Sequence, residues 1–160
     1  MYPIISDMRL YLVQHGHALT KDIDPGRSLS SEGLKEVQSM ATHMYVMRVP
    51  VDKIYHSGKM RAHQTAETFA ETLIVNDDVI AIDGIDPKDS VEAFAKKIAN
   101  LKPNTMIVGH LPFMAKLVSL LVTGKEEPVL VAYRPASVVC LVQDEQKHWH
   151  IGWMLRPDCC

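Results

Sequence analysis

The stretch RLYLVQHGH, residues 9–17, decides the fold, because an apolar run stops there at a glycine that lies between two histidines. Positions 10–13 are all apolar and show no helical spacing, which is typical of a buried strand. Residues 15–29 then lack periodicity and contain the turn-forming Asp24, Pro25 and Gly26, which predicts a long loop. Long loops in compact domains are often functional, so we expect the strand to carry His15 into a functional region.

Helix and strand patterns alternate after this loop. Ser30 is a typical N-cap for a helix that ends before Pro50, and Ser90 is one for a shorter helix farther along. Helices are predicted at residues 31–49, 59–73, 91–98 and 112–122. Strands are predicted at residues 9–14, 53–57, 79–82, 105–109, 136–142 and 148–155, the last two as a hairpin. This order predicts the α/β class, as a three-layer α/β/α sandwich with a mostly parallel, mixed sheet.

The composition is that of an ordinary globular protein. The 160 residues carry a formal charge of -2, with 22% charged and 47% hydrophobic side chains, so nucleic acid is not an expected partner. The length suits one well-buried core, and a single domain is expected over residues 1–160. The long apolar stretch at residues 106–122 is interrupted by His110, Pro112 and Lys116, so no membrane span is expected.

The cysteines indicate a reducing compartment. Cys140 lies in an apolar run, Cys159 and Cys160 are adjacent, and this odd number has no spacing typical of a disulfide framework. The first residues lack the basic start and the small-residue cleavage site of a signal peptide. A cytoplasmic protein is therefore expected.

Three of the predicted strands end in residues that suit phosphate binding. These ends are QHGH (residues 14–17), HSGKMR (residues 56–61) and GHLP (residues 109–112). Ligands of open α/β sheets bind beyond the carboxyl ends of the strands, so we expect the three segments to converge. Arg61, in the first turn of its helix, and Arg27, in the long loop, are expected to hold an anion between them. Two imidazoles and two guanidiniums predict a phosphoryl pocket.

Four ordered blocks of sequence resemble the histidine phosphatase superfamily, the phosphoglycerate-mutase-like enzymes, and most closely its small phosphohistidine phosphatase (SixA-like) branch. The blocks are QHGHA from residue 14, GRSLSSEG from residue 26, HSGKMRAHQTAE from residue 56 and VGHLPF from residue 108. The resemblance implies a phosphoglycerate mutase-like fold and a hydrolase in which His15 takes the phosphoryl group on a ring nitrogen. A neutral imidazole is nucleophilic near pH 7, and water then hydrolyses the phospho-His15 intermediate. The implied substrate is a protein that carries phosphohistidine, such as a phosphotransfer or phosphocarrier domain, and neither a metal nor a cofactor is required.

The resemblance assigns roles to single residues. His15 and His110 are expected to be catalytic, and phosphate binding is expected from Gln14, Gly16, Arg27, Ser57 and Arg61. His17 and Lys59 are further candidates, because both are cationic or can become so near the same strand ends.

Two departures from the family pattern bear on activity. Gln14 stands where the family usually has arginine, and a neutral amide makes weaker contacts with phosphate than a guanidinium does. The segment after the third predicted strand, residues 82–89, is short and lacks the insertion that supplies a carboxylic acid in the larger phosphomonoesterases. A site without such an acid suits phosphohistidine, because a protonated imidazole leaves far more readily than an alkoxide.

Two alternatives to the phosphohistidine phosphatase stay open at this point. One is a phosphomonoesterase that acts on a small phosphate ester. The other is a weakly active or inactive module that binds phosphate, since Gln14 removes a charge. A zinc protein is disfavoured, because His15 and His17 lack a cysteine or carboxylate pair at ligand spacing.

Overall fold

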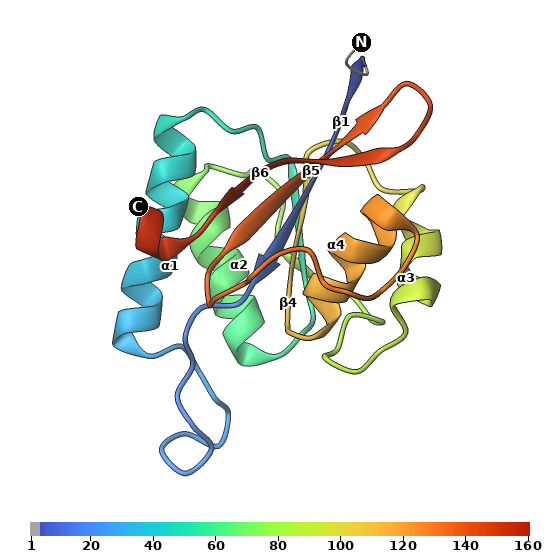
Figure 1. Ribbon diagram of the computed structural model, residues 1–160. Coiled ribbons are helices and arrows are strands. Elements are labelled where there is room, and N and C mark those ends of the chain that lie inside the picture. The colour runs from blue at the N-terminus through green and yellow to red at the C-terminus, as the bar shows by residue number, and fades with distance from the viewer. Residues whose placement is uncertain (1–3) are drawn as a thin grey trace.

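Six strands form one sheet in the order β3-β2-β4-β1-β5-β6 in the computed structural model, which describes residues 4–160 (Figure 1). The strands are β1 (Ile5–Gln14), β2 (Lys53–His56), β3 (Ile80–Ala81), β4 (Thr105–Gly109), β5 (Val138–Asp144) and β6 (Trp149–Leu155). The helices are α1 (Ser31–Val46), α2 (Met60–Thr72), α3 (Val91–Ile98), α4 (Phe113–Thr123) and the short 3-10 helix η1 (Pro157–Cys159).

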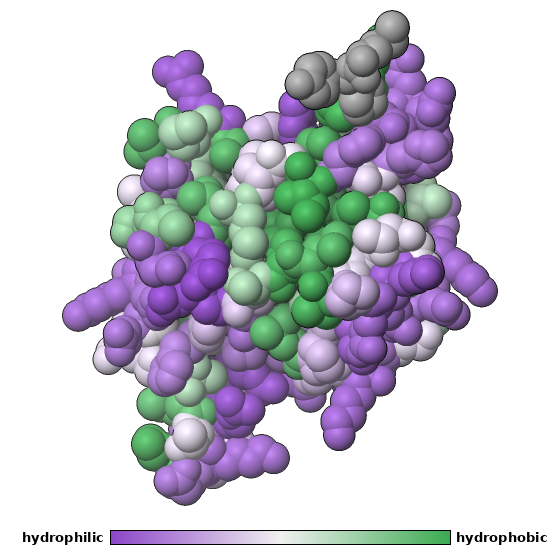
Figure 2. Space-filling view, viewed as in Figure 1, coloured by the Kyte–Doolittle hydropathy of each residue, from purple (hydrophilic) through white to green (hydrophobic). Residues whose placement is uncertain are grey.

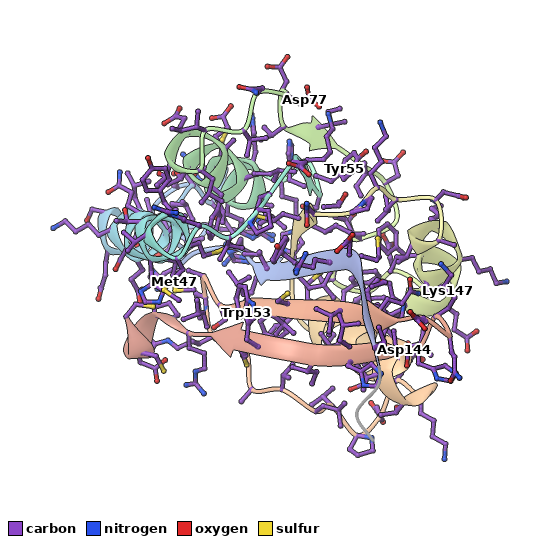
Figure 3. All side chains as sticks on the ribbon, turned by 90° about the horizontal axis from the view of Figure 1, so that it is seen from above. Met47, Tyr55, Asp77, Asp144, Lys147 and Trp153 are labelled. Carbon is purple, nitrogen blue, oxygen red and sulfur yellow. The ribbon has the colours of Figure 1, made fainter. Side chains whose placement is uncertain are left out.

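The sheet is mixed, as predicted. Strands β1, β4, β2 and β3 run parallel to one another. Strand β5 is antiparallel to β1 on one side and to β6 on the other. The terminal hairpin forms the antiparallel edge, and in Figure 3 it lies at one side of the sheet with Asp144 and Lys147 at its turn.

Helices cover both faces of the sheet, which confirms the three-layer sandwich (Figure 1). Tyr11 and Val13 of β1 belong to the core cluster beneath α1 and α2, whereas Leu10 and Leu12 belong to the one beneath α3 and α4. All four of these side chains are fully buried. Each contributes about 1.5–3 kcal/mol through burial, which explains why this strand is a continuous apolar run in the sequence.

Several predicted boundaries shift in the structure, those of β1 and β3 among them. Strand β1 begins at Ile5 rather than Arg9, because its first residues pair with the hairpin at Ile5↔Asp144, where burial is incomplete and the apolar signal is weak. Strand β3 has two residues instead of the predicted four, and both are exposed at the edge of the sheet.

The hairpin side of the molecule carries exposed apolar side chains. Figure 2 shows an apolar area in the region that Figure 1 assigns to β5, β6 and the segment before β5. Val129, Leu130 and Ile151 are among the large apolar residues that remain exposed. No helix within residues 4–160 has the length and apolar character needed to cross a membrane.

The carboxyl ends of the three central strands lie level with one another. Gln14 is paired with Gly109, and His56 is paired with Val108. The segments that follow β1, β2 and β4 therefore begin at one edge of the sheet, as the sequence predicts.

Candidate functional site

Two imidazoles face each other where β1 and β4 end. The ring centroids of His15 and His110 lie 5.0 Å apart, with an angle of 55° between the ring planes. The backbone holds the two segments together, since the N–H of His15 donates to the carbonyl oxygen of Gly109 at 3.0 Å. The predicted convergence of these distant segments is therefore present in the structure.

His15 is held in one tautomer. Its Nδ1 lies 2.7 Å from the carbonyl oxygen of Gly16, and because a carbonyl oxygen only accepts, Nδ1 carries the hydrogen. Burial lowers the pKa of His15 from its ordinary value of 6.5 to about 4, with further lowering by the charges of Arg61 and Arg27. The hydrogen bond from Nδ1 to Gly16 offsets part of this lowering of the pKa. At pH 7 the ring is neutral, and the lone pair on Nε2 is free to attack.

His110 is also neutral at pH 7. Burial lowers its pKa to about 3, and the neighbouring His15, Arg61 and Lys59 lower it further. Its Nε2 lies 2.6 Å from the hydroxyl oxygen of Ser57, whereas Nδ1 is buried and has no hydrogen-bond partner. Ser57, a predicted phosphate ligand, thus contacts the second imidazole of the site.

Two guanidiniums stand beside the imidazoles. Among residues 4–160 neither Arg27 nor Arg61 forms an ion pair, and Nε of Arg61 is buried without a partner. Burial and the charge of Arg27 lower the pKa of Arg61 below its ordinary value, although an arginine stays protonated at pH 7. Two guanidiniums beside neutral histidines are an arrangement that suits an anion.

Hydrogen bonds within the long loop hold Arg27 in place. Its backbone is left-handed, with a φ of 51°, and its Nε donates to the carbonyl oxygen of Leu19 at 3.2 Å. The carboxylate of Asp24 accepts from the amides of Gly26 and Ser28 and from the hydroxyl of Ser28. The loop therefore places Arg27 before any ligand binds.

The backbone groups of Gly16 already have partners. Its carbonyl accepts from His15, and its amide donates to the hydroxyl oxygen of Thr65 at 3.0 Å. A Cβ at Gly16 would lie 2.7 Å from Cγ2 of Val37, so the close approach of α1 requires glycine here. In the structure Gly16 shapes the segment that holds His15, and phosphate contact through its amide stays a prediction.

Gln14 has an unused polar atom. The backbone N–H of Gln14 donates to the carbonyl oxygen of Ser137, whereas its side-chain Oε1 is buried and has no hydrogen-bond partner among residues 4–160. The role of this side chain toward phosphate stays a prediction.

The two further candidates act on different imidazoles of the site. Nδ1 of His17 lies 2.8 Å from the hydroxyl of Ser30, the N-cap residue of α1, and the charge of His17 acts on His15. The charge of Lys59 lowers the pKa of His110, and Nζ of Lys59 lies 3.9 Å from a carboxylate oxygen of Asp86.

Two residues of the site have no assigned role in the sequence argument. Thr65 lies one helical turn after Arg61, so the spacing places both on one face of α2 and offers a signal for Thr65. Asp86 lies in a segment without periodicity, and only the structure shows that it reaches Lys59. No group of three or more histidine, cysteine, aspartate or glutamate side chains in residues 4–160 is arranged to hold a metal ion.

Comparison with known proteins identifies relatives of this chain. The model of the histidine phosphatase superfamily (branch 1) matches residues 10–85. Phosphohistidine phosphatase SixA of Escherichia coli (strain K12) is 25% identical over 155 residues, which cover 94% of each chain.

Solved structures show the same fold. The protein histidine phosphatase SixA complexed with tungstate superposes with a TM-score of 0.81 and 22% identity, covering 95% of this chain and 99% of that one. A phosphoserine phosphatase from Entamoeba histolytica in complex with 3-phosphoglyceric acid superposes with a TM-score of 0.68 and 16% identity, covering 92% and 96%. The phosphoglycerate mutase-like fold predicted from the sequence is confirmed.

Proposed function

Because the model of the histidine phosphatase superfamily matches residues 10–85 of this chain, we propose that the chain belongs to that superfamily and removes phosphoryl groups from protein phosphohistidine through a covalent phospho-His15 intermediate. One observation carries the proposal. His15, neutral at pH 7 with its hydrogen on Nδ1, is acted on by the charges of Arg27 and Arg61, and neither guanidinium forms an ion pair within residues 4–160. An attacking nitrogen beside fixed positive charge is what phosphoryl transfer needs.

The reaction has two steps. Nε2 of His15 attacks phosphorus, and a new N–P bond forms as the N–P bond to the substrate imidazole breaks. The other ring nitrogen of the substrate imidazole is protonated from solvent, so the leaving group takes the electron pair of the broken bond and departs as neutral imidazole. Water then attacks phospho-His15, releases inorganic phosphate and restores the free imidazole. Arg27 and Arg61 hold the phosphoryl oxygens in both steps, and this positive charge replaces the metal ion that other phosphoryl transfers use.

The surroundings of the two imidazoles favour phosphohistidine as the substrate. The carboxylate of Asp86 is half exposed and faces Lys59. Within residues 4–160, no carboxylate forms a hydrogen bond or an ion pair with His15 or His110. An imidazole leaving group takes a proton readily from solvent, whereas an alkoxide needs a positioned acid. The substrate we propose is a phosphotransfer or phosphocarrier domain. The compartment we propose is a reducing one such as the cytoplasm, in keeping with the three free cysteines of this chain.

A small phosphate ester is the second candidate substrate, because the phosphoserine phosphatase shares the fold over most of both chains. Initial rates on a phosphohistidine protein, on phosphoserine and on an aryl phosphate separate the two candidates. We expect the phosphohistidine protein to have the highest kcat/KM, and a higher value for phosphoserine would refute the phosphohistidine proposal.

Trapping of the intermediate tests the chemistry. Rapid quenching at neutral to alkaline pH followed by mass spectrometry is expected to show one phosphoryl group on His15. His15→Ala is expected to lower turnover below about 1% of wild type, since loss of a nucleophile removes the covalent route. His148→Ala is the matched control, because the His148 side chain is 72% exposed at the hairpin turn. Phosphate binding without any adduct would instead identify a binding module.

A further inference from the structure

The hydroxyl of Thr65 lies between the nucleophile segment and the phosphate-binding helix. Its Oγ1 accepts from the amide of Gly16 at 3.0 Å and lies 2.8 Å from the carbonyl oxygen of Arg61. Thr65 is fully buried, so these groups exchange no hydrogen bonds with bulk water. We propose that Thr65 is a positioning residue that fixes the orientation of His15, an inference that rests on the proposed function.

The directions of the two hydrogen bonds are determined by chemistry. A carbonyl oxygen only accepts, so the single hydroxyl proton of Thr65 points to Arg61. A lone pair on Oγ1 then faces Gly16, whose amide can only donate. The result is a continuous chain from the Gly16 N–H through the Thr65 O–H to the Arg61 carbonyl, in which each bond strengthens the next.

Gly16 needs such an anchor because it controls the ring of His15. The carbonyl of Gly16 accepts from Nδ1 of His15 and thereby keeps the lone pair on Nε2. Glycine has the largest backbone freedom of any residue, so its two peptide planes stay in place only if their polar groups are bonded. Thr65 bonds the plane on the amino side, and His15 bonds the plane on the carbonyl side.

The helix itself orients Thr65. A threonine in a helix has few χ1 states, and one of them brings Oγ1 to the carbonyl four residues earlier. In α2 that carbonyl belongs to Arg61, the residue whose guanidinium lies in the anion site. The same bond therefore ties the position of the nucleophile to the turn that carries a phosphate-binding arginine.

Three variants test this role. Thr65→Val keeps the shape and removes the hydroxyl, whereas Thr65→Ser keeps the hydroxyl. Thr68→Val is the matched control, because Thr68 makes the same bond to the carbonyl of Gln64 at 2.9 Å on the same helix. The measurements are kcat and KM for a phosphohistidine protein, binding of inorganic phosphate, and the ¹⁵N chemical shifts of the His15 ring.

We expect Thr65→Val to lower kcat at least about tenfold, since a displacement near 1 Å at a reacting group costs about 100-fold. Phosphate binding should change less than about threefold, because Arg27 and Arg61 remain. The ¹⁵N shifts should show a mixture of His15 tautomers, and Thr65→Ser and Thr68→Val should behave like wild type. A normal kcat with a single tautomer in Thr65→Val overturns the inference, as does a Thr65→Ser variant that is equally impaired.

A measurement on the wild-type protein covers the case in which Thr65→Val does not fold. The amide of Gly16 is expected to exchange with solvent as slowly as amides inside β1, because its hydrogen bond is buried. Exchange at the rate of loop amides would overturn the inference. If wild type lacks phosphatase activity, the proposed function fails, while the ring shifts and amide exchange still test Thr65.

Discussion

Gly33→Ala tests how closely α1 packs against the nucleophile segment. Gly33 lies in the first turn of α1, and a Cβ added there would stand 2.1 Å from the carbonyl oxygen of His17. The same Cβ would lie 3.0 Å from both N and C of His17, so it meets backbone rather than a movable side chain. Real Cβ atoms essentially never approach another heavy atom closer than 3.0 Å, so the backbone has to move.

The expected change in stability has the opposite sign to that of an ordinary glycine-to-alanine substitution in a helix. Glycine to alanine inside a helix normally stabilises by about 1 kcal/mol. Here α1 and His17 must separate by about 1 Å, and overpacking of this kind costs about 1–3 kcal/mol. Because His17 lies two residues after His15, the displacement also reaches the nucleophile. A displacement of about 1 Å lowers the rate by about 100-fold.

The assay combines chemical denaturation with initial rates on a phosphohistidine protein. Gly26→Ala is the matched control, because its Cβ would meet only an oxygen of Asp24 at 3.5 Å, an ordinary contact distance. We expect Gly33→Ala to lose stability and most of its kcat, and Gly26→Ala to keep both. A Gly33→Ala protein that is more stable than wild type and fully active would refute the packing argument.

Three further perturbations have defined outcomes. In the folded protein the pKa values of His15 and His110 lie near 4 and 3, below the ordinary 6.5. After correction for spontaneous hydrolysis of the substrate, kcat/KM should therefore stay level from pH 8 to about 5. A fall in kcat/KM centred on pH 6.5 would contradict this expectation. Below pH 6.5 the unfolded chain binds more protons at these two histidines than the folded chain does. Their contribution to the free energy of unfolding should therefore be fully present above pH 6.5 and decrease toward pH 4, as urea titrations would show. Gln14→Arg should tighten vanadate binding about tenfold by calorimetry, since a charge-assisted contact replaces a neutral one, and unchanged affinity would mean that the pocket is complete with glutamine. Asp86→Asn removes the carboxylate beside Lys59 and should tighten phosphate binding by about twofold to threefold at low salt, whereas weaker binding would show that Asp86 helps to hold the site.

Local signals in the sequence determined most of the secondary structure. Ser30 and Ser90 are N-caps as predicted, and their hydroxyls accept from the amides of Gly33 and Ala93. Capping and apolar spacing depend on residues within one or two turns, so they can be recognised without the fold. The strand at β3 was predicted, but its shorter extent and the early start of β1 were not, because pairing at a sheet edge leaves little apolar pattern.

The order of strands and helices also determined where the site lies. Parallel strands bring their carboxyl ends to one edge, so His15 and His110 could be placed together from their positions after β1 and β4. The residues that carry the proposed chemistry are themselves visible in the sequence, since phosphoryl transfer requires an imidazole and fixed positive charge.

Only the tertiary structure decided how these residues are held. The tautomer of His15, the free guanidinium of Arg61 and the bond from Gly16 to Thr65, 49 positions away, all depend on contacts between elements distant in sequence. Local patterns report which face of an element is buried, but they do not report which atom on another element meets it. Hydrogen bonds and close packing act over about 3 Å, so they are determined only when the chain has folded.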